Sequence, residues 1–162
     1  MINESKLKTG VLVLGGNVIP PVAPAVDFAC QQTNVRLTPS FDDISDAVET
    51  LCGDELAADT KTSWVLAGTS IQDFDDPDGF VYYSLDNDGV TVDFAWQPNE
   101  NGAKFTGKVK VRAVEIGGDV NTRITTDFEW PLEGSPTVTK PTMTVMAGES
   151  HIAEPEPEPA PV

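Results

Sequence analysis

Apolar and polar residues alternate along three segments between Val90 and Pro131. In Val90–Trp96 every second residue is apolar, and in Lys108–Ala113 every second residue is a cation. In Arg123–Trp130 the residues Asp127 and Glu129 alternate with apolar ones. Successive side chains of a strand point to opposite faces, so each segment can bury one face and leave the other polar. The pattern predicts strands whose outward faces carry charge.

Further strands are predicted on both sides of these three. Val35–Thr38 alternates, and Thr62–Gly68 is rich in residues that favour strands. Lys104 to Ile116 is expected to be one long strand, Thr122 to Trp130 the last full strand, and Thr137 to Val145 a short edge strand.

One helix is predicted after residue 76. Asp76 is expected to cap it and Pro77 to take its first position, where the missing donor costs nothing. Phe80, Val81 and Leu85 follow at the spacing of one apolar face, and Gly89 provides the stop. The aspartates also resemble a calcium loop, but counting from Asp73 the fifth position is a proline, so capping is the better interpretation.

Six to eight strands with one helix, and no βαβ rhythm, indicate a mainly β fold: an antiparallel β-sandwich or barrel with one flanking α-helix. We expect an extended arm at residues 1–26, a β-domain at residues 27–145, and a disordered acidic tail at residues 146–162 that is rich in Pro and Glu. Within the arm, Val11–Leu14 is expected to pair with an exposed edge of this subunit or another.

Residues 41–59 carry seven acids and no base, which predicts a long solvated loop or hairpin tip. Val48–Cys52 could return beside Cys30–Leu37 and bring Cys30 near Cys52. A structural disulfide and two buried thiols both remain open, with reduced thiols favoured.

The net charge of the chain excludes binding to nucleic acid and to anionic lipid by charge neutralisation. The 162 residues hold 26 acids and 10 bases, a formal net charge of −16. Such a chain does not neutralise phosphates or anionic lipid, which requires clustered Lys and Arg. The apolar run Val11–Leu14 is too short for a signal core or a membrane span, so synthesis in the cytoplasm and no membrane partner are expected.

No catalytic constellation accompanies the strands. The only histidine, His151, falls in the expected tail, so no ordinary nucleophile–base pair is predicted, and neither a metal nor a cofactor is expected. Trp64, Trp96 and Trp130 could form a platform for sugars, although alternation places two of them inward, where core packing is favoured.

An ordered series of segments carries a family resemblance. The series is Thr62–Gly68, Asp76-Pro77-Asp78-Gly79-Phe80, Ile116-Gly117-Gly118-Asp119, Thr126-Asp127-Phe128-Glu129-Trp130 and Gly134-Ser135-Pro136, with the segments around Cys30 and Cys52. Over residues 27–142 it resembles the major tail tube proteins of phages with long, non-contractile tails.

The resemblance implies a structural virion protein without catalysis, of the tail tube fold. Six copies would form a ring, rings would stack into a tube, and one sheet of each copy would join an inner barrel through which DNA is ejected. The implied partners are further copies, the tape measure, tail tip and tail terminator proteins, and DNA in transit. The alternative from another class is a carbohydrate-binding or adhesive β-sandwich.

Five charged residues are the predicted subunit interface: Lys108, Lys110, Arg112, Asp127 and Glu129. The simpler interpretation is that the cations pair across strands with Asp127 and Glu129 inside one subunit. The alternative is that they meet acids of a neighbouring copy in the 41–59 segment. Residues 1–24 are predicted to bridge rings.

Overall fold

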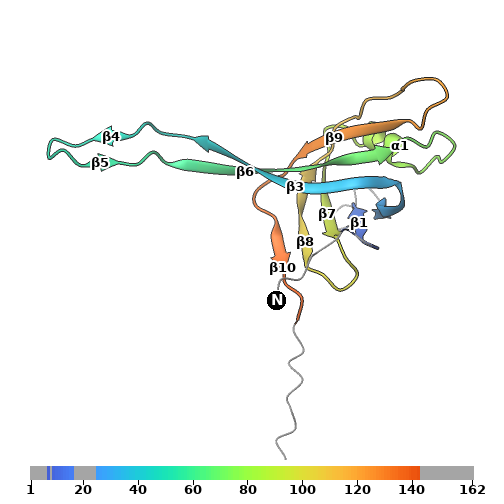
Figure 1. Ribbon diagram of the computed structural model, residues 1–162, viewed down its shortest axis with the longest axis horizontal. Helices are drawn as coiled ribbons and strands as arrows, with labels where there is room; N and C mark the ends of the chain where they lie inside the picture. Colours follow the sequence, from blue (N-terminus) through green and yellow to red (C-terminus); the bar gives the residue numbers. More distant parts are fainter. Residues whose placement is uncertain (1–6, 8, 17–24, 143–162) are drawn as a thin grey trace, which may run out of the picture.

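A computed structural model describes residues 7, 9–16 and 25–142 of the chain. Two antiparallel sheets face each other, and one short helix packs against them (Figure 1). The five-stranded sheet has the order β10-β8-β7-β1-β2, and the three-stranded sheet has the order β3-β6-β9. The predicted mainly β, antiparallel fold with one helix is confirmed, in the sandwich form, because the sheets do not close into a barrel.

The elements follow the chain in the order of their labels: β1 Val11–Leu14, β2 Val26–Asp27, the 3-10 turn η1 Ala29–Gln31, β3 Gln32–Asp43, β4 Val48–Glu49, β5 Glu55–Leu56, β6 Thr60–Ile71, α1 Phe80–Asp86, β7 Thr91–Gln97, β8 Lys104–Lys110, β9 Thr125–Pro131 and β10 Thr137–Thr139.

β1 is a strand of the sandwich. It pairs with β7 and with β2 of the same chain, and Leu12 and Leu14 are fully buried. The expected pairing of Val11–Leu14 is therefore met within the subunit. Residues 1–6, 8 and 17–24 of the predicted arm, and residues 143–162 with the whole of the predicted tail, lie outside the described residues.

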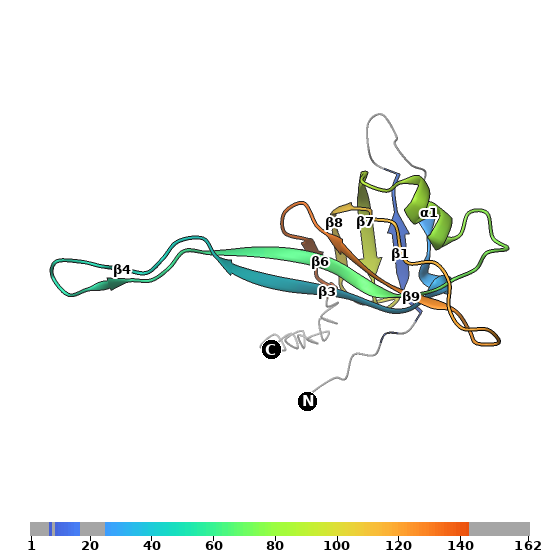
Figure 2. The same cartoon turned by 90° about the horizontal axis from the view of Figure 1, so that it is seen from above.

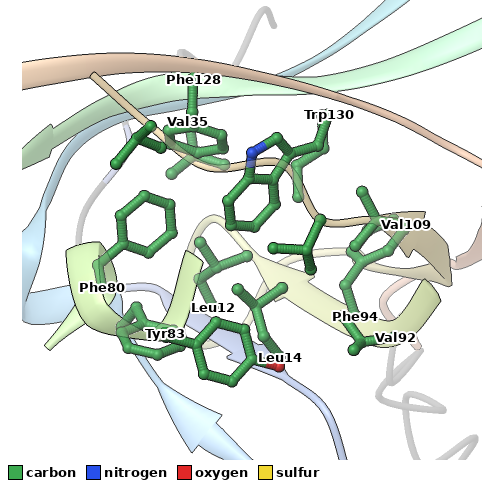
Figure 3. Packing of buried hydrophobic residues seen from close by; sticks show 14 of the residues in the cluster. Leu12, Leu14, Val35, Phe80, Tyr83, Val92, Phe94, Val109, Phe128 and Trp130 are labelled. Atoms are coloured by element: carbon green, nitrogen blue, oxygen red, sulfur yellow. The ribbon is translucent and has the colours of Figure 1, made fainter. Parts of the chain in front are cut away.

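The core fills the space between the two sheets and the helix (Figure 3). Phe80 of α1 stacks on Trp130 of β9, with ring centroids 5.1 Å apart, and lies 4.9 Å from the ring of Phe128. Thr126, Phe128 and Trp130 are buried while Asp127 and Glu129 are exposed, as the alternation predicts. β9 thus presents one apolar and one charged face.

The helix begins later than predicted and has another cap. Asp76 accepts hydrogen bonds from the Asp78 and Gly79 amides and so forms a turn that ends before the helix. The first helical amide, that of Phe80, donates instead to Oε1 of Gln31 at 2.7 Å, while Gln31 Nε2 donates to Asp76 at 3.1 Å. A cap supplied 49 residues away is invisible to local sequence rules. Phe80 and Val81 are buried as predicted, but Leu85 is exposed.

The strand predicted from Lys104 to Ile116 ends at Lys110. Beyond Val111 the backbone bonds to side chains: the Ala113 amide to Asp88 and the Val114 amide to Ser84. Further along, Gln72 accepts from the Gly117 amide at 3.0 Å, and its Nε2 faces the carbonyls of Glu115, Gly117 and Thr125 at 3.2–3.3 Å. These polar side chains replace a neighbouring strand and hold residues 111–117 as a connection.

The residues after β9 join the two sheets. The Leu132 amide donates to the Trp64 carbonyl in β6, and the Glu133 amide donates to the Lys108 carbonyl in β8, both at 2.9 Å. β10 then forms the outer strand beside β8, where a short edge strand was predicted.

Candidate assembly surfaces

β3 and β6 continue far beyond the sandwich as a projecting hairpin (Figures 1 and 2). Their pairing runs without a break from Asn34 opposite Thr69 to Asp43 opposite Thr60. β4 and β5 pair near its end, and Gly53, with φ of 82°, completes the turn. We call residues 41–62 the arm; it is distinct from the N-terminal arm that the sequence predicts for residues 1–26. The hairpin tip predicted for residues 41–59 is confirmed.

The arm exposes apolar side chains. Along one face of β3, Val35 is 9% exposed in the core, Leu37 is half-buried, and Phe41 is 68% exposed. Ile44, Val48 and Leu51 are exposed farther out. An isolated two-stranded hairpin is marginally stable in water, and exposed apolar patches mark surfaces that contact partners. The arm is therefore a candidate contact surface.

The arm is also strongly acidic: its acids are Asp42, Asp43, Asp46, Glu49, Asp54, Glu55 and Asp59, and Lys61 in β6 is its one cation. Thr60 donates to Asp43 at 3.2 Å, and the Asp59 amide donates to Ser45 at 2.8 Å. The surface combines carboxylates with apolar groups, a chemistry suited to a partner that is both cationic and apolar.

Cys30 and Cys52 are both free, as the favoured reduced thiols predict, but they are exposed, so the disulfide and the burial of the thiols are wrong. The reason lies in the topology. Val48 pairs with Leu56 inside the arm, while the partner of β3 is β6, so Val48–Cys52 does not return beside Cys30–Leu37.

β8 and Arg112, two residues after its end, carry a row of cations on the outward face of the five-stranded sheet. Lys104, Lys108, Lys110 and Arg112 are exposed, whereas Val109 and Val111 between them are fully buried. Lys108 lies opposite Asp93 and Lys110 opposite Thr91 in β7. We call these four residues the cationic row.

Asp127 and Glu129 lie on the other sheet, so the predicted cross-strand pairs with the cationic row are wrong. β9 pairs with β6, where Asp127 is opposite Thr69 and Glu129 opposite Ala67. Asp127 accepts a hydrogen bond from the Thr69 hydroxyl at 2.6 Å. The alternation of charge gives each strand's faces correctly but carries no information on which strands are neighbours.

Sheet edges are a second candidate surface. In the described part of the chain, the outer sides of β3 and β9 have no neighbouring strand, and neither do those of β2 and β10. Such edges present unpaired backbone groups and are templates for pairing with another chain. β9 is seven residues long and its outward side chains include Asp127 and Glu129, so a partner on this edge would meet two carboxylates.

An aromatic cleft opens between the sheets on the β10 side. Its volume is about 380 Å³, and it is lined by Arg36, Leu37, Trp64, Trp96, Phe105, Ser135, Pro136 and Val138. Trp96 and Phe105 stack with centroids 5.3 Å apart. Trp130 is buried in the core, as alternation predicts for an inward tryptophan, whereas Trp64 and Trp96 are half-buried at the cleft.

The described residues contain no cluster of three or more histidine, cysteine or acidic side chains arranged to hold a metal ion. No helix among them is long and apolar enough to cross a membrane. His151 lies outside the described residues.

Sequence reasoning missed the apolar part of the arm and the cleft. Phe41, Ile44 and Val48 stand among the acids of 41–59 and were the available signal for the arm. The cleft joins residues of five strands and one connection, so it depends on long-range packing that periodicity does not report.

Comparison with known proteins finds no matching family model and no matching curated protein. Among solved structures, the chain is similar to a protein in the virion of a native gene transfer agent particle. The TM-score is 0.53 at 14% identity, covering 79% of this chain and 95% of the other. The chain is also similar to a protein in the tail of an empty gene transfer agent particle, a tail structure computed with helical refinement and C6 symmetry. Here the TM-score is 0.54 at 14% identity, with the same coverage. At this identity the likeness establishes a shared fold.

Proposed function

We propose that this chain is a structural subunit of a phage-type tail, and that its copies assemble into stacked hexameric rings forming a tube for DNA ejection. The observation that carries the proposal is the arm: a hairpin projecting from the sandwich with exposed apolar groups, in a fold shared with a protein of a gene transfer agent tail. The sixfold symmetry of that tail supports the ring of six.

Edge pairing explains how a ring closes. A closed ring of head-to-tail contacts pairs each exposed strand with the next copy and leaves no edge. The outer sides of β3 and β9 are available for such pairing. Asp127 and Glu129 then belong to the subunit interface.

The cationic row supports contacts between copies in which the cations of one copy meet the carboxylates of the next. A chain of net charge −16 must overcome repulsion to assemble, and four of its ten bases lie in this row. Lys108, Lys110 and Arg112 would meet the carboxylates of a neighbour's arm. Screening confines such forces to about 8 Å at physiological salt, so they act at contact. An acidic wall would likewise keep DNA from adhering without steering it from a distance.

Electron microscopy of the concentrated protein tests the proposal directly. Rings or tubes with sixfold symmetry are expected, and their absence at every concentration and salt condition, together with absence of the chain from purified virions, would overturn it.

Charge reversal tests the cationic row. Lys110→Glu should shorten tubes and lower their yield, because it places a carboxylate against the neighbour's acids. Arg123→Glu is the matched control, since it makes the same charge change at an exposed residue outside the row. Circular dichroism should show both variants folded. Tubes of normal length and yield from Lys110→Glu would refute the role of the row.

The arm is tested at its apolar face. Phe41→Ser should leave the monomer folded, because the side chain is exposed, and should reduce assembly. Val120→Ser, at an exposed apolar residue outside the arm, is the control. Equal assembly of the two variants would contradict the contact.

The prediction that residues 1–24 bridge rings has to be tested with a deletion shorter than the whole segment. Removing all 24 residues would delete β1 and its buried leucines, so the loss of elongation would report unfolding. Deletion of residues 1–6 spares the sheet. Folded subunits that form rings but not long tubes are expected, and normal tubes would refute bridging.

In a virion the subunit would contact the tape measure, tail tip and tail terminator proteins, and it would act without catalysis. A carbohydrate-binding or adhesive module is the second candidate, favoured by one observation: Trp64 and Trp96 line one cleft. A glycan array decides this candidate. Specific glycan binding that is lost in Trp64→Ala would support it, and an empty array would dismiss it.

A further inference from the structure

The aromatic cleft has the chemistry of a site for an extended peptide. The three-stranded sheet contributes Leu37 and Trp64, the five-stranded sheet contributes Trp96 and Phe105, and β10 contributes Val138, which is 48% exposed. Arg36 is the one charged residue of the lining. Grooves lined by aromatic side chains recognise proline-rich segments, whose extended conformation is preformed and loses little entropy on binding.

The chain itself contains a segment of matching composition. Residues 154–161 read Glu-Pro-Glu-Pro-Glu-Pro-Ala-Pro, so four prolines alternate with three acids. Prolines suit the tryptophans, and a carboxylate suits the guanidinium of Arg36. The other proline-rich stretch, residues 20–24, carries no acid and so lacks a partner for Arg36.

We propose that residues 154–161 bind in this cleft within the same molecule. Val138, a wall of the cleft, lies only four residues before Thr142, the last described residue. The eleven residues 143–153 can span up to about 36 Å when extended, so the segment can return to the cleft. A short tether also gives a local concentration in the millimolar range, which favours the attached segment over that of a second copy.

This binding goes beyond the proposed function and does not depend on it, because it concerns a single copy. It assigns a ligand to two half-buried tryptophans and a role to the last residues of the chain: they cover an aromatic surface that would otherwise be open.

Quenching of tryptophan fluorescence by acrylamide tests the proposal. The full chain is compared with a variant that ends at Thr142. Truncation should increase quenching, and a synthetic peptide of residues 149–162, added in the millimolar range, should restore protection. Trp64→Phe and Trp96→Phe assign the change, while the buried Trp130 provides a constant background.

Matched peptides separate the two parts of the recognition. Replacing the four prolines by alanine should abolish protection, and replacing the three glutamates by glutamine should weaken binding about two- to fivefold, as for an exposed ion pair. In the truncated protein, Arg36→Gln should weaken binding of the native peptide by a similar factor and leave binding of the glutamine peptide unchanged.

Four outcomes would overturn the proposal. Truncation could leave quenching unchanged, or the native peptide could fail to protect. Protection in the full chain could disappear on dilution, which would show that a second copy supplies the segment. Finally, glycans could protect the tryptophans where the peptide does not, which would assign the cleft to carbohydrate. Protection that is independent of concentration and restored by the native peptide supports it.

Discussion

Replacing Gln72 by Glu tests the connection between β8 and β9. Gln72 is 8% exposed, its Nε2 lies among three backbone carbonyls, and its Oε1 accepts from the Gly117 amide. Gln72→Glu keeps the shape and the acceptor but replaces the donor nitrogen with an oxygen. It therefore removes only the bonds that the nitrogen makes.

The cost has two parts. Two amide hydrogens serve the three carbonyls, so about two net hydrogen bonds are lost, or about 2 kcal/mol. Burial beside carbonyls also raises the pKa of the introduced carboxyl. A rise of about two pKa units above the usual value for Glu costs about a further 2.6 kcal/mol at pH 7. Because the folded-state pKa is the higher one, this second cost grows as pH rises through the interval and is only about 1 kcal/mol at pH 5.

Urea unfolding followed by tryptophan fluorescence measures both parts, on samples shown to be disassembled by sedimentation velocity. pH 5 is the lower limit because the isoelectric point is about 4.1. Relative to the native chain, Gln72→Glu should lose about 4–5 kcal/mol at pH 7 and about 1.5 kcal/mol less than that at pH 5. Gln97→Glu is the control: its half-buried amide makes one bond, to the Glu100 carbonyl. A penalty for Gln72→Glu that is below about 1 kcal/mol and equal at both pH values would refute the reasoning.

Three further variants test the packing by urea unfolding. Tyr83→Phe should gain about 1 kcal/mol at pH 7, because the Tyr83 hydroxyl is buried without a hydrogen-bond partner; a loss of stability would contradict this. Burial raises the pKa of Tyr83 from 10.0 to about 12, so the native chain should also lose stability relative to this variant as pH rises through that interval, and a constant difference would count against it. Gly68→Ala should cost about 3 kcal/mol, because the added Cβ would meet the Asn34 carbonyl oxygen and the Phe128 ring, and a neutral effect would show that β3 and the Phe128 side chain can shift away from β6 there. Gln31→Ala should cost about 1–2 kcal/mol by removing the cap of α1, and an unchanged urea midpoint would place the cap elsewhere.

Local pattern predicted the faces of the strands well. Asp127 and Glu129 are outward and Phe128 and Trp130 inward because alternation is a property of each strand alone. The same alternation did not predict which strands are neighbours in a sheet. The simpler interpretation placed Lys108, Lys110 and Arg112 beside the acids of β9. β8 and β9 lie in different sheets, however, because register between distant strands is decided by packing across the whole core.

The remaining misses share one physical cause, which is that distant side chains replaced local partners. Gln31 caps a helix from which it is separated by 49 residues, so Asp76 was not needed there. Gln72, Ser84 and Asp88 took over the backbone bonds that would have extended β8 to Ile116. Leu12 and Leu14 lie in an inner strand of a sheet, between β7 and β2, although the neighbouring sequence, rich in glycine and proline, predicted an arm.

The unbroken pairing of β3 with β6 limits how the length of the hairpin can change among related chains. Because side chains alternate with a period of two, adding two residues to each strand would lengthen the hairpin by about 7 Å and leave Phe41 facing as it does now. Adding one residue to each would turn every outer side chain to the opposite face. Viable length variants of this protein should therefore differ by an even number of residues in each strand of the hairpin.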